Sequence, residues 1–310
     1  MRPVFRKLGA VLSIALLLVL TGCSSEQYFV LDPKGPIASA QKDLILITVL
    51  ICTVIAIPVF IITAVIVWRY RDRPNRKASY TPEWEHSTKL ELTWWGIPII
   101  AIIILAVVTV NYTYKLEPSY AIQSDKEPIE IQVTSLDWKW LFTYPEQGIA
   151  TINYVQMPVD TPVRFKLTSD MAMNSFWIPS LGGQLYTMSG MAMTLHLLAD
   201  EEGVYYGSGA NFTGEHFAQM TFDTNVTSQE EFDAWVDEVK ATATALTEED
   251  VQKLKEQGTH EVAQYSSFPE NVFYDIMMQY VEDGEEGAHA HHATTSEDAE
   301  GSDHSEHQHH

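Results

Sequence analysis

Residues 44–68 read LILITVLICTVIAIPVFIITAVIVW, a run of apolar side chains without a charged residue. A helix of this length, rising about 1.5 Å per residue, crosses the roughly 30 Å hydrocarbon core of a bilayer. A second uncharged apolar run, from Thr93 to Tyr112, is also long enough to span a membrane. The two runs predict a membrane α-helical hairpin with spans at about 44–68 and 93–112.

The segment between the two runs is basic. It contains Arg69, Arg71, Arg73, Arg76, Lys77 and Lys89. Short loops that flank membrane spans and are rich in Lys and Arg stay in the cytoplasm. The connecting loop is therefore predicted to lie inside the cell, and both ends of the chain outside.

The N-terminus has the layout of a secretory signal. Two arginines and a lysine precede an apolar run at 8–20 that is too short to span a bilayer. The run ends in Leu-Thr-Gly-Cys23, which resembles the lipobox of bacterial lipoproteins. That resemblance implies removal of a signal peptide at 1–22 and a lipid anchor on Cys23, at the outer face of a bacterial cell membrane. A plain signal and an uncleaved anchor are the alternatives.

Beyond the second span the hydrophobic pattern becomes that of strands. Segments such as 129–134 and 162–167 alternate apolar and polar residues, and Pro, Gly and Asp turns separate them. A period of two is typical of strands that bury one face. After an N-terminal segment and hairpin at 23–115, the region 127–223 is therefore predicted to be an all-β sandwich.

The pattern turns helical at 227–281. Ser228 and Glu231 have the spacing of a capping box, and further helices are predicted from Thr247 and after Pro269. The segment 282–310 is acidic and His-rich without Lys or Arg, so it is predicted to be disordered. Such a tract binds zinc, nickel or copper weakly; the alternatives are a solvated acidic tail and, in part, a purification tag.

Three blocks carry a family resemblance: ELTWWGIP at 91–98, NSFWIPSLGG at 174–183 and YGSGANFTGEHFAQM at 206–220. They resemble subunit II of the haem-copper respiratory oxidases, which implies that the sandwich is a cupredoxin-like domain. In the members that use cytochrome c, the second block begins with His and the third carries C-x-x-x-C-x-x-x-H-x-x-M, which together hold a dinuclear copper centre. The corresponding positions here read Asn174, Gly209, Thr213 and Phe217, and only Met220 is retained.

These replacements predict that the chain holds no metal. A dinuclear copper centre needs bridging thiolates, and the chain has only two cysteines. They are Cys23 and Cys52, both in the N-terminal apolar region. His216 stands one residue before Phe217 and becomes a ligand only through a register shift, and the soluble part of the chain has no thiolate to accompany it.

The resemblance therefore implies subunit II of a proton-pumping quinol oxidase. It implies that haem, copper and the main quinol-binding residues belong to subunit I, and that this chain contributes assembly and a cap on its outer face. By the same resemblance Glu91 is a candidate for proton entry; the alternative is an interfacial charge. Trp138 and Trp140 are expected to pack against a partner subunit.

Two other classes of function remain open from the sequence. One is a cytochrome c oxidase subunit II that recruits copper through unusual ligands. The other is an envelope lipoprotein that handles metal through its His and Met residues. The formal charge of −22 argues against nucleic acid as a partner, because binding to a phosphate backbone needs positive charge.

Overall fold

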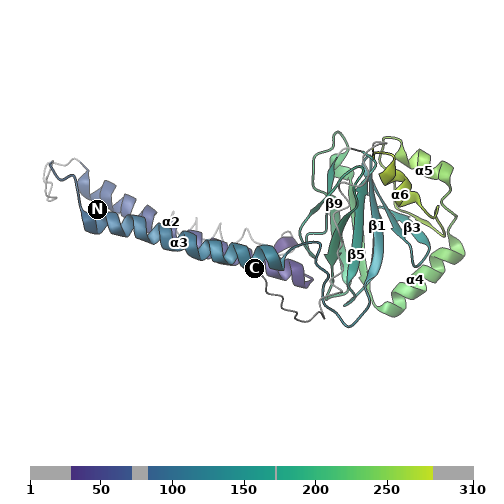
Figure 1. Cartoon of the computed structure of the whole chain (residues 1–310), viewed down its shortest axis with the longest axis horizontal. Helices are drawn as coiled ribbons and strands as arrows, with labels where there is room; N and C mark the ends of the chain where they lie inside the picture. The colour runs from purple at the N-terminus through teal and green to yellow at the C-terminus, as the bar shows by residue number, and fades with distance from the viewer. Residues whose placement is uncertain (1–28, 72–82, 172, 282–310) are drawn as a thin grey trace, which may run out of the picture.

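The computed structural model describes residues 29–71, 83–171 and 173–281. The predicted signal peptide at 1–22, the lipidation site Cys23 and the predicted disordered tail at 282–310 lie outside the described residues. Within the described part, the chain forms a long helical hairpin joined to a β-sandwich, with helices at the far side of the sandwich (Figure 1).

The hairpin consists of α2 (Pro36–Tyr70) and α3 (Thr88–Lys115), and the short 3₁₀ helix η2 (Phe29–Leu31) precedes it. Both long helices are long and apolar enough to cross a membrane. Most of their large apolar side chains are exposed when the chain is taken alone. A helix that is apolar on all sides needs lipid or other membrane proteins around it, because water does not solvate such a surface.

The sandwich contains two sheets. The strands of the first are β1 (Ile129–Leu136), β2 (Lys139–Tyr144), β3 (Ile149–Ile152), β5 (Val163–Ser169), β8 (Met193–Leu197) and β11 (Ala263–Tyr265). The strands of the second are β4 (Tyr154–Pro158), β6 (Asn174–Trp177), β7 (Leu185–Thr187), β9 (Gly203–Gly209) and β10 (Thr221–Thr227). Their orders are β11-β3-β2-β1-β5-β8 and β4-β10-β9-β6-β7. The pairs β1–β5 and β4–β10 are parallel, and the other neighbours are antiparallel.

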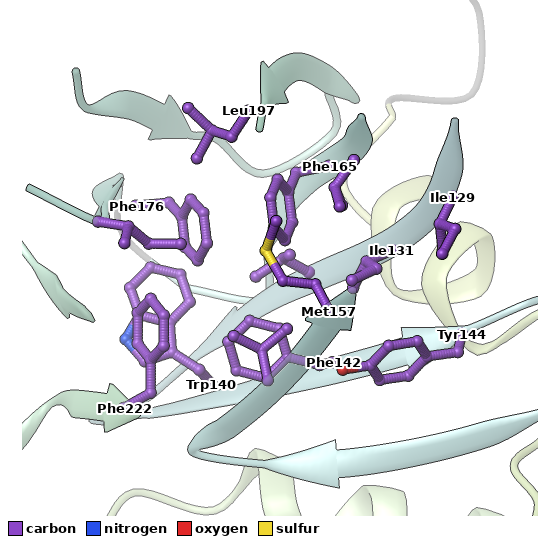
Figure 2. Close-up of a cluster of buried hydrophobic side chains, with 14 of the residues drawn as sticks. Ile129, Ile131, Trp140, Phe142, Tyr144, Met157, Phe165, Phe176, Leu197 and Phe222 are labelled. Carbon is purple, nitrogen blue, oxygen red and sulfur yellow. The ribbon is translucent and has the colours of Figure 1, made fainter. Parts of the chain in front are cut away.

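Aromatic rings fill the space between the two sheets (Figure 2). Trp140 and Phe142 from β2 and Phe165 from β5 meet Phe176 and Phe222 from the opposite sheet. The rings of Phe176 and Phe222 stack with their centroids 5.2 Å apart. Large aromatic side chains bury about 150–250 Å² each, so this cluster is the main apolar contribution to the stability of the sandwich.

The C-terminal extension contains α4 (Gln229–Thr242), α5 (Glu248–Lys255) and α6 (Val272–Met278), on the side away from the hairpin (Figure 1). Two of these helices, α5 and α6, cover the outer face of the first sheet, and α4 packs its buried side chains on the core between the sheets. Leu136, Leu141 and Ile152 of the sheet form a second buried cluster with residues of the extension. Strands β1 to β3 are therefore buried on both faces. The prediction that alternating residues of β1 face solvent is wrong, because helices from the far end of the chain cover them.

The two helix starts of the extension have different caps. The Ser228 side chain accepts a hydrogen bond from the Glu231 amide, but the reciprocal bond of a capping box is not among its contacts. Thr247 and Asp250 form the complete capping box at the start of α5.

The predicted combination of a helical hairpin, an all-β sandwich and a helical extension is confirmed.

Candidate functional site

The central feature of the site is a buried pair of side chains, Asn174 at the start of β6 and Met220 before β10. The Asn174 amide nitrogen Nδ2 lies 3.0 Å from the Met220 sulfur, and both residues are inaccessible to solvent. The Asn174 Oδ1 accepts a hydrogen bond of 2.8 Å from the Ser175 amide, which fixes the orientation of the side chain. Nδ2 also has a long contact, 3.5 Å, to the Ser135 hydroxyl.

Gly209, at the end of β9, lies directly beside the Asn174 side chain. A Cβ added at Gly209 would lie 3.0 Å from Asn174 Nδ2 and 3.1 Å from its Oδ1. That spacing is tighter than ordinary van der Waals contact, so the amide occupies the space that a side chain at 209 would need. The structure thus brings together three of the five positions singled out in the sequence: Asn174, Gly209 and Met220.

The other two positions lie on the loop between β9 and β10. The Thr213 hydroxyl is buried and has no hydrogen-bond partner among the described residues. Phe217 points its ring toward Phe212, with centroids 5.7 Å apart, and the Phe212 side chain is 81% exposed. The half-buried Phe217 ring therefore packs within the loop. Its backbone carbonyl accepts a hydrogen bond of 3.1 Å from the Met220 amide, so Phe217 is joined to the Asn174–Met220 pair through its main chain.

Trp138 holds this loop in place. Its indole nitrogen donates a hydrogen bond of 3.1 Å to the Thr213 carbonyl, and its ring meets the His216 ring edge-on at 4.8 Å. Trp138 adopts φ 62°, a left-handed backbone conformation that costs a bulky residue energy. It is only 6% exposed, and Trp140 is 0% exposed in the core. The prediction that these tryptophans pack on a partner subunit is therefore wrong, because their own chain buries both.

The residues at this site do not suit a dinuclear copper centre. An amide, a thioether and a hydroxyl lack the thiolates that bridge such copper pairs. Cys52, the one cysteine of the described segments, lies in α2. Those segments contain no group of three or more His, Cys, Asp or Glu side chains that could hold a metal ion. His216 contacts Trp138 and takes no part in the pair.

The glycines of the 174–183 block serve a different purpose from the pair. A Cβ at Gly182 would lie 2.6 Å from a Leu197 methyl and 3.2 Å from an Ile37 methyl, and one at Gly183 would lie 2.6 Å from Gln41 Nε2. Because Ile37 and Gln41 belong to the first turns of α2, these two glycines let the start of the hairpin pack directly on the sandwich.

Backbone hydrogen bonds also hold this contact between the start of the hairpin and the sandwich, which is called the joint below. The Lys34 amide donates to the Ser180 carbonyl at 2.7 Å, and the Ala38 amide to the Leu181 carbonyl at 3.1 Å. The Lys34 ammonium is 2.6 Å from a Glu201 carboxylate oxygen. The hydrogen bond with Glu201 is the main cause that raises the pKa of Lys34.

The exit from α3 forms the other half of the joint. The Pro118 carbonyl oxygen lies 3.2 Å from the His196 amide and 3.3 Å from His196 Nδ1. Burial lowers the pKa of His196; the hydrogen bond to Pro118 opposes this shift and the nearby Arg164 adds to it. The imidazole is thus held in its neutral form, as a donor to the carbonyl.

Glu91 lies in the first turn of α3, at the end of the hairpin far from the sandwich (Figure 1). Its Oε1 is 3.4 Å from Nδ1 of His86. The side chain is 51% exposed in the chain alone. The Asn174–Met220 pair lies in the sandwich at the opposite end of the hairpin, so Glu91 has no part in that site.

Comparison with known proteins places these features in a family. The model of the cytochrome c oxidase subunit II transmembrane domain matches residues 23–112, and that of its periplasmic domain matches 119–227. Cytochrome bo(3) ubiquinol oxidase subunit 2 of Pseudomonas putida is 46% identical over 277 residues, which cover 89% of this chain and 87% of the relative. Quinol oxidase subunit 2 of Bacillus subtilis is 43% identical over 290 residues, covering 91% and 86%.

The chain belongs to the quinol oxidase subunit II family. It is accordingly a membrane protein with two transmembrane helices and a periplasmic domain of the cupredoxin-like type. The solved periplasmic domain of cytochrome oxidase subunit II from Bradyrhizobium japonicum is 22% identical, covers 39% of this chain and 98% of its own, and has a TM-score of 0.37. That score is too low to add to the assignment.

The side chains that hold the C-terminal extension of this subunit II to its sandwich were not predictable from the sequence. The buried Lys139 ammonium donates to the carbonyls of Glu256 at 2.8 Å and Gly258 at 2.7 Å, and burial lowers its pKa. The Asp170 carboxylate lies 3.1 Å from the Lys255 ammonium. Lys139 stands between the two tryptophans singled out in the sequence, but its partners are backbone carbonyls, which any residue type offers, so no sequence signal marks these contacts.

Proposed function

We propose that this chain works as subunit II of a haem–copper quinol oxidase in which electrons enter from membrane quinol. In the overall reaction, two quinols and one dioxygen give two quinones and two waters, so four electrons and four protons pass from quinol to oxygen. The names of the relatives from Pseudomonas putida and Bacillus subtilis support this function. Catalysis belongs to the complex, and this chain is a non-catalytic subunit of it.

The observation that carries the proposal is the Asn174–Met220 hydrogen bond of 3.0 Å. By family resemblance, Asn174 and Gly209 stand where copper-bearing relatives have a His and a Cys. Because the Asn174 amide is hydrogen-bonded to the Met220 thioether, the position that holds a ligand in copper-bearing relatives is here part of the packed core. The same amide fills the space beside Gly209. Without thiolates the domain has no soft ligand set for a copper pair. A soluble cytochrome would then find no electron acceptor in this subunit.

The proposal assigns haem and copper to subunit I, the principal partner in the complex. The uncharged stretches of α2 and α3, at 44–68 and 93–112, expose apolar side chains that are suited to packing beside other membrane helices and lipid. The sandwich, joined to the outer end of the hairpin through the Gly182–Gly183 turn, would cap the outer face of that subunit. The chain thus contributes assembly and shielding.

Glu91 is proposed as a proton-entry residue. With the basic loop in the cytoplasm, the first turn of α3 lies at the cytoplasmic membrane surface. A carboxylate there can collect protons from water. The His86 imidazole, whose Nδ1 lies 3.4 Å from the Glu91 carboxylate, is a second group at this position that can carry a proton. This role is separate from electron entry, because Glu91 and the sandwich stand at opposite ends of α3.

Cys23 is proposed as a lipid anchor after removal of residues 1–22. Even the two acyl chains of a diacylglycerol hold a protein less firmly than an inserted transmembrane helix does, so the two spans would retain the protein without the anchor. Mass spectrometry of the wild-type protein should find a lipidated Cys23 at the mature N-terminus. An unmodified Met1 would show that the interpretation as a lipobox is wrong.

The central experiment is isolation of the complex from native membranes. Oxygen consumption is compared with quinol and with reduced cytochrome c as donors, alongside haem spectra and copper quantification. We expect turnover with quinol, none with cytochrome c, and copper at one atom per complex. Turnover with cytochrome c together with two further copper atoms would contradict the proposal. A variant lacking 282–310 serves as the control, because the His-rich tail can bind copper adventitiously.

A further inference from the structure

A groove of about 320 Å³ lies between the two helices of the hairpin, next to the sandwich. It is lined by Leu44, Thr109, Tyr112, Thr113, Leu116, Glu117 and Pro118. The hydroxyl of Thr113 is already engaged, because it donates to the Thr109 carbonyl at 2.9 Å. The groove is therefore mainly apolar, and its size is in the range of small-molecule sites.

The position of the groove along α3 determines which layer of the membrane surrounds it. The 28 residues of α3 rise about 42 Å, whereas the hydrocarbon core is about 30 Å thick, so the helix ends reach the headgroup layers. The groove is lined by the last turns of α3, which end at Lys115. Its apolar wall consequently lies within the outer hydrocarbon boundary, and its upper rim lies among the headgroups.

Opposite charges stand at this rim. Glu117 lines the groove, and Lys115, two residues before it, has its ammonium 5.6 Å from the centre of the Tyr112 ring that forms part of the wall. Both charged residues are exposed. Glu117 Oε1 accepts a hydrogen bond of 3.2 Å from the Ser119 hydroxyl, which holds the carboxylate at the rim. A cation and an anion on the same rim complement a headgroup that itself carries one negative and one positive charge.

We propose that the groove holds an acyl chain of a zwitterionic phospholipid, with Lys115 toward its phosphate and Glu117 toward its amine. Tyr112 presents an aromatic face at the headgroup level, as aromatic residues do at membrane interfaces. Pro118, at the upper rim, is bound through its carbonyl to His196 of the sandwich. The bound lipid therefore braces the hairpin at the joint where it meets the outer domain.

The test measures the phospholipid that stays with the detergent-purified complex, by mass spectrometry. Leu44→Trp fills the groove and should reduce the tightly held phospholipid several-fold. Ile103→Trp is the matched control, because Ile103 is 58% exposed on α3 and does not line the groove. Equal retention in both variants would overturn the proposal. Loss of assembly, or a raised KM for quinol, in Leu44→Trp alone would also overturn it, since the occupant would then be a protein helix or quinol.

Headgroup variants test the charge assignment without filling the groove. The delipidated complex is incubated with vesicles of phosphatidylethanolamine or of phosphatidylglycerol, and the lipid it retains is measured. The wild type should prefer phosphatidylethanolamine. Glu117→Gln should remove most of that preference, and Lys115→Gln should weaken the retention of both lipids. An unchanged preference in Glu117→Gln would show that the rim charges do not read the headgroup and would overturn the zwitterionic assignment.

Discussion

The side-chain nitrogen of Asn174 and the sulfur of Met220 lie 3.0 Å apart in a place that water does not reach. A buried donor left without its acceptor costs roughly 1–3 kcal/mol. Met220→Leu should therefore destabilise the domain by that amount, because only the long Ser135 contact remains for the amide. Asn174→Leu should cost at least as much, since the Ser175 amide also loses its acceptor.

The double variant separates the pair from its surroundings. If the two side chains interact, the free energies of unfolding of the single variants should fail to add, with a coupling of about 0.5–3 kcal/mol. Urea unfolding of the full chain in detergent, followed by tryptophan fluorescence, measures all three variants. If the changes in the free energy of unfolding simply add, the two side chains are neighbours that do not stabilise each other.

The second prediction concerns copper binding by a variant that lacks the His-rich segment 282–310. After incubation with copper salts and removal of free metal, it should show no thiolate-to-copper absorption and no stoichiometric copper, because Asn174 and Gly209 offer no thiolate. Optical spectroscopy and elemental analysis provide the measurement. A purple species with two coppers per chain would refute the interpretation of the site.

The third prediction tests the joint at Gly35. A Cβ there would lie 2.1 Å from the Leu198 carbonyl oxygen, and a backbone atom cannot move aside as a flexible side chain can. Gly35→Ala should cost roughly 1–3 kcal/mol or more through this overlap. Hydrogen exchange at the Ala38 amide, which donates to the Leu181 carbonyl, should speed up.

Gly96→Ala is the matched control for Gly35→Ala. Nothing lies within 4 Å of a Cβ at Gly96, inside α3, and alanine favours a helix over glycine by about 1 kcal/mol. Exchange at the Ala38 amide should not change in this variant. Faster exchange in both variants would mean that the effect comes from the hairpin as a whole.

The sequence is most informative where a feature is local. The spans around 44–68 and 93–112 are visible because an uncharged run of sufficient length has few uses outside a membrane. The spacing within 206–220 identified the altered positions in the same way, through one short block. That the Phe217 ring packs within the loop beside Phe212, apart from the Asn174 side chain, depends on the path of the loop and has no local signal.

The contacts between distant segments could not be predicted. Strand β11 pairs with β3, and Lys139 binds backbone carbonyls near the end of α5. A short strand has no periodicity to detect, and a carbonyl partner is the same for any residue type. The outer face of β1 is likewise buried by a distant segment, since Leu136 packs in one cluster with Val272 and Ile276 of α6. The alternating pattern of β1 residues therefore gave the wrong exposure for that face.

The fourth prediction concerns pH and His196. Its pKa in the folded chain is lowered from 6.5, so the unfolded chain binds more protons as the pH falls through 6.5 toward the folded pKa. The stability that neutral His196 contributes is complete above this window and is lost below it. His196→Gln keeps a donor for the Pro118 carbonyl but does not titrate. The drop in Tm from pH 7.5 to 5.5 should therefore be smaller in His196→Gln than in the wild type.

The last prediction tests Glu91 as a proton-entry residue. Glu91→Gln removes the titrating group and keeps its size, so the effect should be on protonation. We expect turnover of the complex to fall several-fold, equivalent to roughly 1 kcal/mol in barrier, with little change in KM for quinol. Glu91→Asp should recover part of the rate. Glu83→Gln, on the loop before α3, is the control and should turn over normally. Wild-type turnover of Glu91→Gln across pH, or a change confined to KM, would leave Glu91 as an interfacial charge.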